Sequence, residues 1–148
     1  MTKHRLDLRL IEEETFSIIG IVSSMEVYRL AFFLNKELNW FLKKESFEID
    51  DSYSVYSYYE ESKDLNINLI GNTAWKKSEA SEGLFDNVAS KTYLLKEKKK
   101  ADYLLKISEE IDYKSIEHII KKLKSIASIQ TCYPIAIDEL KTTEFLIF

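Results

Sequence analysis

Two carboxylates and a phenol lie close together in the second half of the chain, at Glu97, Asp102 and Tyr103. A carboxylate pair can carry acid–base chemistry, and with Tyr103 as a hydrogen-bond donor and Arg29 nearby it would form a small catalytic or ligand pocket. The structural alternative is a tight corner in which Asp102 accepts backbone N–H groups and the Tyr103 ring fills the core with its hydroxyl at the rim. Paired carboxylates alone are a weak sign of catalysis, so the pattern favours the corner.

No other reactive centre is indicated by the sequence. The two histidines, His4 and His118, fall in different elements, whereas a zinc site needs three or four converging ligands. Cys132 has no neighbouring cation or base, which is typical of a small buried hydrophobic residue rather than a nucleophile. The chain has 3 glycines and none of the glycine-rich phosphate-binding motifs. We therefore expect no metal and no cofactor, and we assign no catalytic residue.

Positive charge is concentrated in residues 91–124, which hold 10 Lys and Arg against 6 Asp and Glu, although the whole chain has a formal charge of −4. Lys98, Lys99 and Lys100 form a charged corner, and Lys121 belongs to the basic side of a predicted helix. Such a patch could meet an acidic partner or a phosphate backbone. The structural alternative is a solvated surface.

Four tyrosines in the run 53–59 raise a separate question. Strand alternation sends Tyr56 and Tyr58 to one face of the sheet and the other two to the opposite face. Either the sheet is covered on both faces, or an aromatic pair is exposed. Acidic residues flank the run and would repel phosphates, so exposed tyrosines here suit a protein partner better than RNA.

Two amphipathic helices are predicted to position these groups. Ser23 and Glu26 have capping-box spacing, so a helix should begin there and continue with apolar residues at helical intervals to about residue 38. The second helix has Asp112 as its predicted N-cap and an apolar stripe over 116–127. Lys121 lies on its polar side.

Strands are predicted at 16–22, 41–49, 53–59, 65–70, 101–107 and 129–133. Residues 65–69 alternate between aliphatic residues and asparagine, which is typical of a sheet with one solvent-facing side. Pro134 is expected to end the last strand, because proline has no N–H for the ladder. Residues 72–90 show no sustained helical or strand periodicity, which predicts a long loop. The apolar end at 145–148 should dock on the rest of the fold as a strand or a plug.

The order of these elements favours the α+β class. We predict a single domain over residues 1–148, with a mainly antiparallel β-sheet of about five or six strands and two amphipathic helices packed on one face. A chain of 148 residues and 17.4 kDa is long enough to bury one core.

The sequence also bears on the compartment. A single cysteine cannot form an internal disulfide, which fits a reducing environment. The N-terminal residues lack the apolar run of a signal peptide, and no stretch approaches the roughly 18 apolar residues of a spanning helix. We expect a cytoplasmic protein without membrane association.

Four stretches of the chain, taken in order, carry a resemblance to a known family: KHRLDL at 3–8, IGIVSSMEVYRLAFFLNKEL at 19–38, KEKKKADYLLKI at 96–107 and TCYPIAIDELKTTEFLIF at 131–148. They are similar to the bacterial IPExxxVDY family, named for a motif in its second half, and the similarity runs nearly from end to end. The resemblance implies a fold and a compartment rather than an activity.

The family motif falls on the charged corner. Its positions correspond in this chain to Leu95, Lys96, Glu97, Ala101, Asp102 and Tyr103. Glu97, Asp102 and Tyr103 match the motif, whereas Lys96 replaces its proline. Because proline fixes its own φ and biases the preceding residue to extended geometry, we expect the corner to be less rigid here.

Three functions remain open from the sequence. The first is a non-enzymatic protein–protein interaction or adaptor module, acting on a partner protein or as a homo-oligomer. The second is an RNA-associated accessory protein that uses the basic segment 91–124. The third is a small ligand-binding protein or enzyme built around Glu97, Asp102 and Tyr103. The missing catalytic constellation favours the first.

Overall fold

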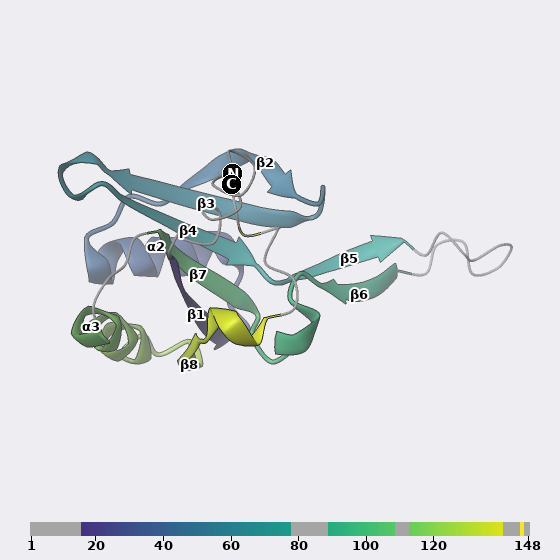
Figure 1. Cartoon of the computed structure of the whole chain (residues 1–148). Coiled ribbons are helices and arrows are strands. Elements are labelled where there is room, and N and C mark those ends of the chain that lie inside the picture. Colours follow the sequence, from purple (N-terminus) through teal and green to yellow (C-terminus); the bar gives the residue numbers. More distant parts are fainter. Residues whose placement is uncertain (1–15, 78–88, 109–112, 141–145, 147–148) are drawn as a thin grey trace, which may run out of the picture.

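A computed structural model describes residues 16–77, 89–108, 113–140 and 146, and it confirms the α+β class. The main sheet has six antiparallel strands in the order β2-β3-β4-β7-β1-β8 (Figure 1). They are β1 (Phe16–Ser23), β2 (Lys43–Ile49), β3 (Tyr53–Glu60), β4 (Leu65–Gly71), β7 (Tyr103–Ser108) and β8 (Ile129–Ile135). Each of these six strands overlaps one predicted from the sequence.

Two helices cover one face of the sheet, as predicted. They are α2 (Val27–Leu38) and α3 (Tyr113–Lys124). Leu34 of α2 and Leu123 of α3 are both fully buried, in one cluster with Ile19 of β1 and Leu105 of β7. The helical spacing of apolar residues therefore places both helices on the same core.

The turn before α2 differs from the predicted capping box. Glu26 is the N-cap residue, but its side chain makes no capping hydrogen bond. The hydroxyl of Ser23 instead accepts the N–H of Met25 at 3.1 Å and donates to the carbonyl of Ser128 at 2.8 Å. This serine is already engaged at the end of β1, so it cannot cap the helix. Asp112, the predicted N-cap of α3, lies outside the described residues.

The opposite face of the sheet is also buried, so the prediction of one solvent-facing side is wrong. Asn68 is 2% exposed and Lys106 is 3% exposed, with its Nζ 5.1 Å from the centre of the Phe16 ring. Short 3₁₀ helices, among them η4 (Ile137–Glu139), and the chain next to them close this face, where Leu95 and Leu146 are buried. Leu146, the one described residue of the apolar end, therefore docks as a plug.

Two further expectations are corrected by the structure. Residues 72–90, predicted as loop, begin and end in the strands β5 (Thr73–Lys77) and β6 (Ala89–Tyr93). These strands pair with each other and project from one end of the main sheet (Figure 1). Pro134 lies within β8 instead of ending it, because β8 is an edge strand, where a residue without an N–H is tolerated.

Candidate functional site

The segment between β6 and β7 makes a sharp turn that carries four lysines, and we call residues 96–100 the lysine corner. It contains one turn of 3₁₀ helix (Lys96–Lys98). The N–H of Lys98 donates to the Leu95 carbonyl at 3.0 Å, and the N–H of Ala101 donates to the Lys98 carbonyl at 3.1 Å. Leu95 and Ala101 are both buried, so the lysine corner is anchored to the sheet at each end.

A single buried side chain holds the lysine corner in place. Asn72, between β4 and β5, has no exposed surface. Its Oδ1 accepts the N–H of Leu95 at 2.8 Å. Its Nδ2 donates to the carbonyls of Lys98 at 3.0 Å and Ala101 at 2.8 Å. Sequence reasoning missed this role, because an asparagine after a glycine indicates only a turn and gives no sign of a distant partner.

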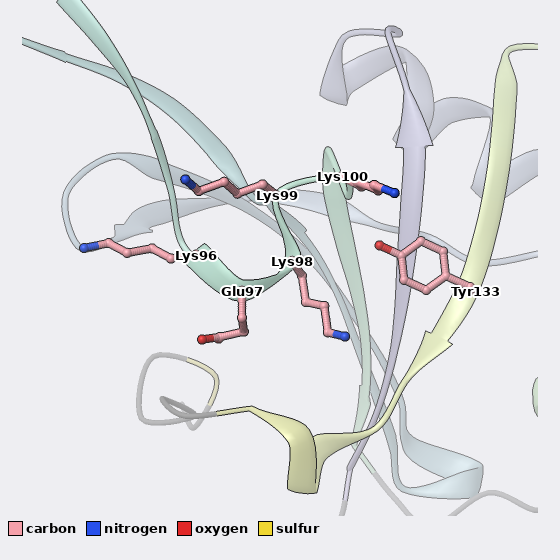
Figure 2. Close-up of a pocket in the computed structure, with 6 residues that line it drawn as sticks. All are labelled: Lys96, Glu97, Lys98, Lys99, Lys100 and Tyr133. Carbon is pink, nitrogen blue, oxygen red and sulfur yellow. The ribbon is translucent and has the colours of Figure 1, made fainter.

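The lysine corner borders a hollow of ≈ 470 Å³. Its lining residues are Lys96, Glu97, Lys98, Lys99, Lys100 and Tyr133 (Figure 2). In Figure 2 the side chains of Lys98 and Lys100 extend on the side of Tyr133, whereas those of Lys96 and Lys99 extend away from it. Ammonium groups and a phenol hydroxyl are hydrogen-bond donors that can share one anion, such as a phosphate or a carboxylate.

Tyr133 reaches this hollow because its partner across the β1–β8 ladder is a glycine. Tyr133 pairs with Gly20. A Cβ atom at Gly20 would lie 3.1 Å from Cζ of Tyr133 and 3.0 Å from Cδ1 of Ile135, so the tyrosine ring lies across the glycine. Nothing in the residues next to Tyr133 points to the lysine corner, and sequence reasoning assigned it no part in the site.

Asp102 and Tyr103 bind the turn before α2. The carboxylate of Asp102 accepts the N–H of Ser23 at 2.9 Å, and the hydroxyl of Tyr103 donates to the carbonyl of Met25. Burial raises the pKa of Tyr103 to about 12, and two nearby carboxylates add to the shift. Asp102 thus accepts a backbone N–H group, as the structural alternative predicts, but this group belongs to β1 and not to the corner itself.

Two residues of the predicted acid–base pocket border different hollows. Glu97 lines the hollow at the lysine corner, and Arg29 lines another of ≈ 330 Å³ beside Tyr28. Asp102 and Tyr103 line neither of these two hollows, and their side chains bond to the backbone.

Lys121 belongs to a second group of lysines, on α3. It is exposed, and together with Lys124 and Pro134 it lines a hollow of ≈ 470 Å³. Pro134 follows Tyr133 directly in β8, and successive strand residues point to opposite faces. The two lysine groups therefore flank the same end of the edge strand β8, one on each side of the sheet.

Tyr56 and Tyr58 lie on the helix side of β3, where the chain itself partly buries both of them. Phe41 extends this aromatic group outward, because it is 67% exposed and its ring meets the Tyr58 ring edge-on, with centroids 5.9 Å apart. The neighbouring backbone is held by Asn35 of α2, whose side chain bonds the N–H and the C=O of Leu42 at 2.8 and 3.2 Å.

A further exposed aromatic residue, Phe32, lies on α2. It is 62% exposed, and its ring packs edge-on against Phe33, with centroids 5.5 Å apart. Residues three apart share one side of a helix, so Phe32 lies on the side of α2 that carries Asn35. We call the group made of Phe32, Phe41, Tyr56 and Tyr58 the aromatic surface.

Cys132 and the possible metal ligands are the other reactive groups that can be placed among the described residues. Cys132 is buried in β8, and its thiol donates to the carbonyl of Ile120 at 3.6 Å. Burial raises the pKa of Cys132, which disfavours the nucleophilic thiolate. Within the described ranges, no three histidine, cysteine, aspartate or glutamate side chains are grouped closely enough to hold a metal ion.

Comparison with known proteins does not assign this site. No family model matches the chain, and no curated protein matches it. In the part of the chain that the structure describes, no helix combines the length and the apolar character needed to cross a membrane.

Replacing Asn72 with alanine should destabilise the protein. The change removes three side-chain hydrogen bonds from a fully buried position. Since each buried group left unpaired costs roughly 1–3 kcal/mol, we expect N72A to lower the free energy of unfolding, measured in urea, by about 3 kcal/mol. The control N66A, at a half-buried residue of β4, should change it by about 0.5 kcal/mol or less. Equal losses in the two variants would contradict the role of Asn72.

Tyr103 should make stability fall with pH in alkaline solution. Its pKa is about 12 in the folded chain against an ordinary value of 10.0, so the folded state holds the phenolic proton more tightly. This stabilisation is complete below about pH 10 and is lost as the pH rises towards about 12. In Y103F we expect a shallower loss of unfolding free energy over this range, and an ultraviolet titration should lack one phenol that ionises near pH 12 in the wild type. If the unfolding free energy falls equally steeply with pH in the wild type and in Y103F, the assignment of the raised pKa to Tyr103 is contradicted.

Proposed function

We propose that this protein is a non-enzymatic cytoplasmic interaction module that binds another protein, or a second copy of itself, through the aromatic surface. The observation that carries the proposal is the exposure of Phe32 and Phe41, two large apolar side chains on ordered parts of the fold. Isolated exposed apolar residues are ordinary, but grouped aromatic side chains are typical of the centre of an interface.

The aromatic surface is organised in a way that favours binding. Phe41 packs on Tyr58, and Phe32 packs on its neighbour in α2, so binding would immobilise few additional rotamers. Lys43 and Lys44 follow Phe41 on β2 and are exposed. An apolar centre with charged residues beside it is the usual composition of a protein–protein interface.

The resemblance to the IPExxxVDY family belongs to the same proposal. Of the positions that match its motif, Asp102 and Tyr103 bind the turn before α2, and Glu97 lines the hollow at the lysine corner. On this proposal, the end of the motif serves the fold by joining β7 to α2. Catalysis would need these side chains to be free to act on a substrate, and two of the three are engaged with the backbone.

Charge insertion into the aromatic surface should weaken partner binding. We expect F32E/F41E to weaken the interaction at least roughly tenfold, because a buried carboxylate would replace two aromatic contacts. The measurements are sedimentation over a concentration series, for self-association, and quantitative affinity capture of a stoichiometric partner from lysate of the source cells. The control W75E, at a 70% exposed tryptophan of the β5–β6 hairpin, should bind normally. A wild-type protein that stays monomeric and captures no stoichiometric partner would rule the proposal out.

A second candidate function, binding of RNA, is favoured by the two lysine groups that flank β8. Lys98 and Lys100 line the hollow beside Tyr133, and Lys121 and Lys124 line the hollow beside the next residue of the strand. Part of the positive charge of residues 91–124 is thereby gathered at one edge of the sheet. A phosphate backbone that crosses this edge could contact both groups.

Reversing one lysine of each group tests the second candidate. Each phosphate contact that is lost lowers the slope of log affinity against log salt concentration by roughly 0.7–0.9, so K100E/K121E should lower it by about 1.5 and weaken binding of single-stranded RNA in fluorescence anisotropy. The control K43E/K44E has the same net charge on β2 and should retain the wild-type slope. RNA binding that is insensitive to salt, or equally impaired in both variants, would exclude this candidate.

A further inference from the structure

The β5–β6 hairpin is a two-stranded ribbon that projects from the main sheet, and its two faces have different surroundings (Figure 1). One face is fastened to the body of the fold. The hydroxyl of Tyr53 donates to Oγ1 of Thr92 at 3.0 Å, and Nζ of Lys76 lies 3.0 Å from the carboxylate of Asp50. Successive strand residues point to opposite faces, so the residues next to Lys76 and Thr92 point away from this attachment.

The other face of the hairpin carries a large aromatic side chain. Trp75 of β5 pairs with Lys91 of β6, and the next pair on this face is Thr73 with Tyr93. Paired residues of an antiparallel ladder share a face, so Trp75 and Tyr93 are diagonal neighbours across the ribbon. Trp75 is 70% exposed, and it is the most exposed large apolar side chain among the described residues. Its indole ring is therefore open to a flat ring from another molecule.

Two lysines converge on Tyr93 at the base of this face. Nζ of Lys91 is 5.7 Å from the centre of the Tyr93 ring, and Nζ of Lys99, from the lysine corner, is 5.6 Å from it. Both distances are within the range of a cation–π contact. In Figure 2 the Lys99 side chain extends away from Tyr133, so the lysine corner also presents charge to the hairpin. Two ammonium groups thus lie beside the face that carries the indole.

The hairpin sequence also holds three acidic residues, in the part outside the described residues: Glu79, Glu82 and Asp86. Phosphate contacts are therefore assigned only to Lys91 and Lys99, whose positions are set by their contacts with Tyr93, and not to the hairpin as a whole. Stacking of a ring on Trp75 does not depend on charge.

We infer that this face of the hairpin binds single-stranded nucleic acid, with one base stacked on Trp75 and the neighbouring phosphates beside Lys91 and Lys99. An exposed aromatic ring next to lysines is the usual means of holding single strands without reading their sequence. A duplex keeps its bases stacked inside the helix and offers the indole no ring. The inference rests on the second candidate function, binding of RNA, and adds to its phosphate contacts a surface that receives a base.

Trp75 itself reports the binding. The chain has two tryptophans, and the other, Trp40, is 8% exposed. An oligouridine of about twelve nucleotides, or its oligothymidine counterpart, should quench the fluorescence of the full-length protein saturably. Quenching by one or by both supports the inference and shows which sugar is accepted. The signal of W75F, which retains Trp40 alone, should not change.

Inorganic polyphosphate is the control ligand, because it carries the charge without the bases, and it should not quench Trp75. Equal quenching by polyphosphate would overturn the inference. Absence of quenching by both oligonucleotides would overturn it as well, and this is the result expected if the acidic part of the hairpin repels phosphates.

Affinities for labelled oligouridine, measured by fluorescence anisotropy, test the two kinds of contact separately. W75A should weaken binding at least roughly fivefold, the loss expected for one stacked base, and W75F should restore most of the affinity because it keeps a ring. K91E/K99E should lower the slope of log affinity against log salt concentration by about 1.4, since each phosphate contact of a single strand contributes about 0.7. The control K43E/K44E should retain the wild-type slope.

The same measurements separate this inference from the functions proposed above. If W75A binds oligouridine like wild type while K100E/K121E binds it more weakly, the second candidate stands and the inference is refuted. If W75A is weakened and K100E/K121E is not, the strand binds at the hairpin and not at β8. If W75E loses a captured protein partner and W75A binds oligouridine normally, the indole belongs to a protein interface, which also refutes the inference.

Discussion

Both faces of the six-stranded sheet are apolar, and the arrangement of the other elements follows from the need to exclude water from each of them. Ile18 and Ile19 are neighbours on β1, they point to opposite faces, and they are 2% and 0% exposed. Helices α2 and α3 cover one face. Among the described residues, short 3₁₀ helices and the chain next to them cover the other.

Short 3₁₀ turns and irregular chain are a difficult cover for a sheet, because their backbone N–H and C=O groups have no regular ladder to pair with. At the lysine corner the side chain of Asn72 pairs with three such backbone groups, because its oxygen accepts one N–H and its NH₂ group donates to two carbonyls. Through these bonds to the backbone, the Asn72 side chain fixes the position of the segment that carries the four lysines, although none of these bonds involves an ammonium group. A buried polar residue that serves the core in this way also shapes the charged surface above it.

The groups with the most reactive chemistry are occupied by the fold, and the groups left at the surface are suited to binding. Asp102 and Tyr103 bond to the backbone before α2, and the buried thiol of Cys132 has a raised pKa. Phe41 and Lys100, by contrast, are exposed beside ordered structure. This division is the physical basis for the binding function that we propose.

The amino-acid sequence alone is enough to predict the two helices, the six main strands and the fact that Tyr56 and Tyr58 share one side of β3, because these depend on the spacing of residues within one element. Only the tertiary structure decided that the second face is buried, that β5 pairs with β6, and that Tyr133 joins the lysine corner across Gly20. A local pattern shows which side of an element faces a core, but not which distant residues cover it. That choice depends on strand order and register, which are set by contacts between residues far apart in the chain.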